Sequence, residues 1–205
     1  MSITIGVLAI QGDVAENVLA TKTALEQSDV SGKVIEVKTP QDVEKIDGLI
    51  LPGGESTMMG QLSLVNGSLK QIKEKISAGM PVFGICAGLI LLSKNASDRI
   101  VGNMDQPLLD MIDVTVERNS FGRQQESFEA KVSMDSLGIS EFNGVFIRAP
   151  SISQLGDGVE AVSKFNDKVV AVKKGNILGT AFHPELTQDA SLHKYFLNMV
   201  SSQTS

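Results

Sequence analysis

The only cysteine of the chain lies in a short segment of small residues, Gly84-Ile85-Cys86-Ala87-Gly88. A strand-like apolar run precedes it and a helical pattern follows, so the segment has the form of a nucleophile elbow, a tight turn that exposes its central side chain. The positive end of the following helix favours a thiolate. A buried cysteine packed under a sheet is the plain alternative, but the small neighbours and the adjoining helix favour a reactive thiol.

A base for such a thiol is present in His183-Pro184-Glu185, directly after the apolar run Ile177 to Phe182. Proline fixes the chain between the two polar residues. A carboxylate two residues on could accept the distal imidazole N–H and stabilise the imidazolium. A turn histidine with a chance acidic neighbour is the alternative, and we prefer a triad of Cys86, His183 and Glu185. The second histidine, His193, falls in the final helical pattern, where we expect it to be solvated.

Two further features suit a substrate site. Glycines in Pro52-Gly53-Gly54-Glu55-Ser56 follow a strand, so backbone amides there could complete an oxyanion hole with the amide of Ala87. A plain turn is the alternative, and a phosphate loop lacks the lysine it requires. Arg118 and Arg148 each close a predicted strand and could hold a substrate carboxylate by paired hydrogen bonds, although surface ion pairing fits them equally well.

The elements that must position these residues alternate over the first half of the chain. Strand-like runs and helical spacings follow one another, at Ile3 to Ile10, Val14 to Leu25, Val34 to Val37, Gly48 to Leu51, Leu69 to Ile76, Pro81 to Ile85 and Leu89 to Leu92. This order predicts an α/β fold with a doubly wound, mostly parallel, flavodoxin-like sheet. Ligands bind beyond the carboxyl ends of such strands, which is where Cys86 falls.

The second half is predicted to add antiparallel strands. The strand-like segments are Ile112 to Glu117, Phe128 to Val132, Val145 to Arg148, Val159 to Phe165, Val169 to Val172 and Ile177 to Phe182. Turns are expected at Asn166-Asp167 and at Lys174-Gly175-Asn176. A final amphipathic helix carries Leu192 and Phe196, and residues 201–205 are expected to form a frayed tail. We expect residues 1–205 to form a single domain.

The composition excludes several classes of protein. Of 205 residues, 42% are hydrophobic and 20% charged, which is typical of a globular protein. The net charge of −6 and the lack of a basic, aromatic-rich cluster argue against nucleic acid. Neither a signal peptide nor a membrane-spanning run is found, so a cytoplasmic protein is expected. One cysteine allows neither an intrachain disulfide nor a multi-thiolate metal site.

Taken together and in this order, the motifs resemble those of the class I glutamine amidotransferases, and within them the glutaminase subunits of pyridoxal 5'-phosphate synthases. The resemblance covers nearly the whole chain. Its most specific stretches are Ile10-Gln11-Gly12-Asp13, residues 51–57, Cys86-Ala87-Gly88, residues 116–124, Phe146-Ile147-Arg148-Ala149-Pro150 and residues 183–187.

The resemblance implies a role for each matching residue. Cys86 would be the nucleophile, with His183 and Glu185 as its relay. The glutamine site would be lined by Gly54, Glu55, Ser56, Arg118, Ile147 and Arg148. Gln11 would lie near an oxyanion hole formed by Gly54 and Ala87, close to a partner surface. The chain departs from the family at Asn17, where relatives often carry histidine; we expect this position to lie away from the triad and to affect partner contact.

The implied reaction is hydrolysis of L-glutamine to L-glutamate and ammonia through a glutamyl thioester, with no metal or organic cofactor. The implied partner is a separate (β/α)8-barrel synthase subunit that uses the ammonia to make pyridoxal 5'-phosphate in a hetero-oligomer. Two alternatives stay open. One is a cysteine-elbow peptidase, deglycase or redox sensor of similar fold, and the other is a catalytically silent binding module.

Overall fold

The structure is a computed structural model that describes residues 2–98, 102–103, 105–121 and 127–204. Residues 122–124, the end of one of the motif stretches above, lie outside the described residues. The larger sheet contains β1 (Ile3–Leu8), β2 (Gly32–Val37), β3 (Gly48–Leu51), β4 (Val82–Ile85), β5 (Ser93–Asp98), β6 (Gly102–Asn103), β7 (Ile112–Arg118), β10 (Ser151–Leu155), β11 (Glu160–Phe165), β12 (Lys168–Lys174) and β13 (Ile177–Thr180). A separate two-stranded sheet contains β8 (Ser127–Met134) and β9 (Ile139–Ile147).

The strand order of the larger sheet is β2-β1-β3-β4-β13-β12-β10-β7-β5-β6, with β11 paired to β12. The first five strands of this order run parallel, although β13 comes from the far end of the sequence. Strands β12, β10 and β7 then pair antiparallel. The predicted fold class, a mostly parallel α/β sheet with added antiparallel strands, is confirmed.

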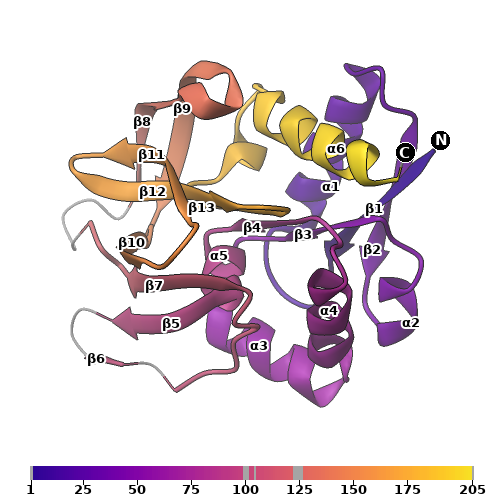
Figure 1. Cartoon of the computed structure of the whole chain (residues 1–205), viewed down its shortest axis with the longest axis horizontal. Helices are drawn as coiled ribbons and strands as arrows, with labels where there is room; N and C mark the ends of the chain where they lie inside the picture. The colour runs from indigo at the N-terminus through magenta and orange to yellow at the C-terminus, as the bar shows by residue number, and fades with distance from the viewer. Residues whose placement is uncertain (1, 99–101, 104, 122–126, 205) are drawn as a thin grey trace.

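Helices cover both faces of the parallel strands (Figure 1). They are α1 (Val14–Glu26), α2 (Pro40–Val43), α3 (Ser56–Val65), α4 (Ser68–Ser77), α5 (Ala87–Leu92) and α6 (Ser191–Gln203), with 3-10 turns η1 (Asp135–Leu137) and η2 (Pro184–Leu186). Helices α1 and α6 lie on one face, and α3, α4 and α5 lie on the other. Among the described residues, no helix is both long and apolar enough to span a bilayer.

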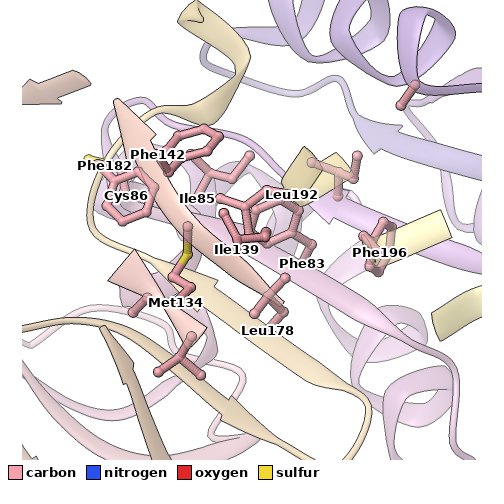
Figure 2. Packing of buried hydrophobic residues seen from close by; sticks show 14 of the residues in the cluster. Phe83, Ile85, Cys86, Met134, Ile139, Phe142, Leu178, Phe182, Leu192 and Phe196 are labelled. Atoms are coloured by element: carbon pink, nitrogen blue, oxygen red, sulfur yellow. The ribbon is translucent and has the colours of Figure 1, made fainter. Parts of the chain in front are cut away.

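The parallel strands β1, β3, β4 and β13 are buried on both faces because the helices form two separate cores, whereas β2 at the edge of the sheet is partly exposed. Ile50, Phe83 and Phe196 belong to the core under α1 and α6. Leu49 and Leu51 point the other way, into the core under α3 to α5. Figure 2 shows part of the first core, which continues through Phe182 up to Cys86. The packing therefore holds the carboxyl ends of β1, β3, β4 and β13 in one fixed row.

The second half contains the predicted strands and turns, but β9 begins at Ile139, before the predicted Val145, and β10 is an additional strand. Asn166 and Asp167 both have positive φ, 46° and 62°, as a two-residue hairpin turn between β11 and β12 requires. Gly175 has a φ of 54° in the turn between β12 and β13. Phe146 of the hairpin β8–β9 packs against Phe182, with ring centroids 5.4 Å apart. The hairpin therefore contacts the residue that directly precedes His183.

Several elements differ from the sequence-based expectation, and among them α2 and β10 were not predicted. Helix α3 was not predicted, because the exposed fractions of Leu64 and Val65 are 58% and 86% and its apolar residues follow no single face. Strand β5 was not predicted because its sequence, Ser-Lys-Asn-Ala-Ser-Asp, is polar; it is held by pairing with β7. Helix α6 continues to Gln203, past residue 201 where the tail was expected to begin.

The prediction that His193 is solvated is wrong. His193 lies on α6, but its exposed fraction is only 1% and its ring meets Phe83 edge to face at 5.9 Å. Neither ring nitrogen has a hydrogen-bond partner among the described residues. Burial lowers the pKa of His193 to about 4. The helical period alone could not distinguish this position from the exposed side of α6, because histidine is compatible with both.

His193 should make the fold sensitive to acid. Its pKa falls from 6.5 in the unfolded chain to about 4 in the folded one, so below pH 6.5 the unfolded state binds the proton and gains stability. Between pH 6.5 and pH 4 this costs the native state about 3 kcal/mol. We expect His193→Leu to remove that part of the pH dependence in urea unfolding at pH 7.5, 6 and 5. Identical pH dependence in the two proteins would contradict this account.

Candidate active site

Cys86 lies between β4 and α5 in a strained turn. Its φ of 50° is in the left-handed region, which side chains other than glycine seldom adopt. The turn is so tight that a Cβ on Gly88 would overlap the Leu51 carbonyl, and a Cβ on Gly84 would lie 2.8 Å from the Gly88 backbone. The Cys86 amide donates to the Thr180 carbonyl at 2.8 Å, which ties the elbow to the end of β13. These contacts explain why small residues flank the cysteine.

His183 lies three residues beyond β13, with its ring beside the elbow. Its amide donates to the Val145 carbonyl at 2.8 Å, so β9 fixes its backbone. Nδ1 lies 2.8 Å from Glu185 Oε1, and the Glu185 side chain is fully buried. Because Nδ1 faces this carboxylate, Nε2 is the ring nitrogen left to serve Cys86. The structure thus places the three predicted triad residues together.

The charges around His183 favour its protonated form. Burial by itself lowers the pKa of His183, but hydrogen bonds to Asp13, Cys86 and Glu185 outweigh burial and raise it far above the ordinary value. An imidazolium beside Cys86 stabilises a thiolate, the form of cysteine that acts as a nucleophile. The site therefore places a proton donor, the imidazolium, beside the Cys86 side chain.

Two loops after neighbouring strands are joined beside the elbow. Gln11 follows β1, and its Oε1 accepts the Glu55 amide at 2.8 Å in the loop after β3. The Asp13 amide donates to the Gly53 carbonyl at 3.0 Å. Gly53 must be glycine, because a Cβ there would lie 2.9 Å from His183 Nδ1 and would overlap the ring. The loops therefore pack directly against the histidine.

Cys86 and His183 open into a pocket of about 360 Å³. It is lined by Asp13, Gly54, Glu55, Ser56, Cys86, Ala87, Ile90, Arg118, Asn119, Ile147, Arg148, Pro150 and His183. The pocket thus gathers the residues expected to bind glutamine. Gln11 and Glu185 do not line it: Gln11 braces the loop of Glu55, and Glu185 lies behind the histidine.

Glu55 and Arg118 are bound to each other across the pocket mouth. Arg118 Nη2 lies 3.2 Å from Glu55 Oε1, and the Glu55 carboxylate also caps α3 by accepting the Thr57 and Met58 amides. Burial raises the pKa of Glu55, but these amides and Arg118 outweigh burial and lower it. Glu55 is therefore negatively charged and holds the Arg118 side chain in position.

Ser56, the next residue of the same loop, is buried. Its hydroxyl donates to Gln106 Oε1 at 3.2 Å.

Arg148 is the less constrained cation of the pocket. It follows β9 with a φ of 42°, and within the described part of the chain it makes no ion pair. Its neighbour Ile147 is 37% exposed and contributes apolar surface to the same wall. An unpaired guanidinium beside an apolar wall suits a small substrate that carries a carboxylate and a short alkyl chain.

Asp13 is a site residue that sequence reasoning did not single out. It stands at the N-cap of α1, and one of its carboxylate oxygens lies 3.4 Å from His183 Nδ1. The pattern Gly12-Asp13 before a helix predicts an ordinary N-cap, so the sequence offered no signal for this contact. Only the approach of the β1 and β13 ends brings the two residues together.

Asn17 lies on α1 as expected, but it does not belong to an accessible surface. Its side chain is fully buried, and Nδ2 donates to the Asp13 carbonyl at 2.8 Å. The side chain is therefore not exposed to a partner directly, and it is one hydrogen bond away from Asp13, which contacts His183. Through Asp13, Asn17 supports the backbone next to His183.

The chain matches the model of the SNO glutamine amidotransferase family over residues 7–202. It is 61% identical over 200 residues to pyridoxal 5'-phosphate synthase subunit PdxT of Nitrosopumilus maritimus (strain SCM1), covering 98% of each chain. It is 51% identical to the protein of the same name in Geobacillus kaustophilus (strain HTA426), covering 96% of this chain and 94% of the relative. A crystal structure described as a glutamine amidotransferase superposes with a TM-score of 0.83 at 41% identity, covering 96% of this chain and 98% of that one.

Proposed function

This chain belongs to the SNO glutamine amidotransferase family, and on that premise we propose that it is the glutaminase subunit of a pyridoxal 5'-phosphate synthase. It hydrolyses L-glutamine to L-glutamate and ammonia through Cys86, His183 and Glu185. The observation that carries this proposal is the histidine ring held at 2.8 Å by a buried carboxylate beside a cysteine elbow, in a pocket where Arg148 makes no ion pair with the described residues.

Acylation begins when the Cys86 thiolate attacks the side-chain amide carbon of glutamine. The oxyanion that forms is stabilised by backbone amides near Gly54 and Ala87, both of which line the pocket. His183 gives its proton to the amide nitrogen, the carbon–nitrogen bond breaks, and ammonia leaves. A glutamyl thioester on Cys86 remains.

Deacylation uses the same histidine as a base. The thioester sulfur is neutral, so the thiolate no longer helps to hold a proton on the ring and the pKa of His183 falls. The neutral imidazole takes a proton from water as the water oxygen attacks the thioester. Glutamate leaves, and the thiolate and the imidazolium are restored. Glu185 keeps the ring orientation fixed through both steps.

The arginines account for recognition of the amino-acid end of glutamine. Arg148 binds the α-carboxylate, because it is the cation of the pocket wall without an ion pair among the described residues. Arg118, already engaged by Glu55, contributes a second positive group at the mouth. The glutamine side chain then extends along Ile147 toward Cys86, with the amide carbon at the sulfur.

The ammonia is delivered to a synthase subunit, since the similar proteins are named as subunits of pyridoxal 5'-phosphate synthase. We propose that this partner is a (β/α)8 barrel and that the two chains form a hetero-oligomer in the cytoplasm. The reaction of this chain requires no metal and no organic cofactor, since thiolate, imidazole and backbone amides supply the nucleophile, the proton transfers and the oxyanion site.

The function is tested by supplying the synthase subunit of the same organism with pentose and triose phosphates and with either glutamine or an ammonium salt. Pyridoxal 5'-phosphate should form from glutamine only when this chain is present, with stoichiometric glutamate release. Ammonium should support synthesis without it. Glutamine-dependent synthesis that does not need this chain would overturn the proposal.

A further inference from the structure

Asp13 is built like a helix cap but does not act as one. The side chain of an aspartate at the N-cap usually accepts a hydrogen bond from a backbone amide of the first turn. The Asp13 side chain makes no such bond to α1. Its carboxylate instead lies 3.4 Å from His183 Nδ1, the nitrogen that also faces Glu185. The contact with the histidine thus replaces the local bond that this residue type favours.

The backbone around Asp13 holds the carboxylate in this place. The Asp13 amide donates to the Gly53 carbonyl, and both the amide and the Nδ2 of Asn17 donate to the Asp13 carbonyl, at 3.3 and 2.8 Å. Gly53 leaves room, because a Cβ there would lie 2.8 Å from Asp13 Oδ2. The contact is therefore fixed by the ends of β1 and β3 as well as by α1.

Asp13 and Glu185 occupy different environments. The Glu185 side chain is fully buried, whereas that of Asp13 is 41% exposed and lines the substrate pocket. Among the described residues, the charged or titratable groups that face His183 are Asp13 just before α1, Cys86 between β4 and α5, and Glu185 in η2. When Cys86 is acylated and loses its charge, two carboxylates remain beside the ring.

We propose that Asp13 is a positioning residue for the glutaminase reaction, a second carboxylate that shares His183 Nδ1–H with Glu185 and stabilises the imidazolium. This inference rests on the proposed function. Glu185 sets the ring orientation from the protein interior, and Asp13 adds negative charge from the side of the pocket. The hydrogen bond to His183 lowers the pKa of Asp13, which keeps this charge in place at neutral pH. The charge should in turn hold the proton on His183 to higher pH.

The first test follows the histidine itself by nuclear magnetic resonance in the purified chain. Only two histidines are present, so His183→Gln assigns the signals. We expect Asp13→Asn, which keeps the size and capping ability of the side chain, to move the His183 titration to lower pH by about one unit. Asp13→Glu restores the charge and should recover most of the shift. An unchanged His183 titration in Asp13→Asn would overturn the inference.

The second test measures glutamine hydrolysis against pH in the complex with the synthase subunit. Asp13→Asn should lower kcat about tenfold near neutral pH, move the alkaline limb to lower pH, and leave KM within about twofold. Asp42→Asn is the matched control, since Asp42 also caps a helix start, at α2, but does not line the pocket. A raised KM with normal kcat would mean that Asp13 binds substrate and would overturn the proposed role. An inactive wild-type complex would contradict the proposed function and leave the resonance test to decide on Asp13.

Discussion

Replacing Cys86 with serine should lower kcat for glutamine hydrolysis by about 10³-fold or more. Serine fits the strained turn at a φ of 50° and keeps the size of the side chain, so the elbow should survive. The hydroxyl, however, does not ionise beside the imidazolium, and it is a far weaker nucleophile than a thiolate. The measurement is glutamate release by the variant in complex with the synthase subunit.

Glutamine binding by the Cys86→Ser variant provides the control. Calorimetry should show that the variant still binds glutamine, because Arg148 and Arg118 are untouched. Its dissociation constant should lie within a few-fold of the wild-type value measured under conditions where glutamine is bound but not hydrolysed. Synthesis of pyridoxal 5'-phosphate from ammonium should also be unchanged in the complex. Residual hydrolysis within tenfold of wild type would show that another residue is the nucleophile.

Replacing Gly53 with alanine should cost about 10²-fold in kcat while leaving the fold intact. The new methyl group would overlap the His183 ring and lie 2.8 Å from Asp13 Oδ2, so the ring must move away from Cys86 or turn from Glu185. A displacement of about 1 Å in a catalytic group is sufficient for a loss of this size. The measurement is the kcat of the variant complex, alongside its thermal unfolding.

The matched control is Gly175→Ala, in the turn between β12 and β13. Gly175 has a φ of 54° and no atom within 4 Å of an added Cβ, so alanine strains the backbone there without touching the site. We expect the opposite pattern, a loss of roughly 1 kcal/mol in stability with normal kcat. Equal activity losses in the two variants would mean that a general loosening of the fold, and not the displaced ring, is responsible.

Local patterns were sufficient to predict the fold class, the cysteine elbow and the hairpin turns. The run before Cys86, the glycines on either side of it and the helix behind it all depend on residues adjacent in sequence, which is why the elbow could be recognised. The turn at Asn166-Asp167 was predictable for the same reason, since few residues adopt positive φ. The pairing of β13 with β4, which brings His183 to the elbow, is a long-range contact that the sequence pattern alone does not specify.

The parts that escaped prediction depend on tertiary contacts. Asp13 carries the pattern of a helix cap, and only the three-dimensional approach of His183 gives it another partner. His193 matches a solvated helix position, yet α6 turns that side toward Phe83. Polar β5 becomes a strand because β7 offers it hydrogen bonds. In each case packing or pairing with a distant segment overrides the local preference.

The most direct test of the central claim is covalent trapping of the nucleophile in the assembled complex. A glutamine analogue with a diazoketone in place of the side-chain amide is added, and the labelled peptide is identified by mass spectrometry. We predict one adduct per chain, on Cys86, suppressed by excess glutamine and strongly slowed in His183→Gln. Labelling at another residue, or an unlabelled Cys86 in a complex that releases glutamate from glutamine, would contradict the proposed mechanism.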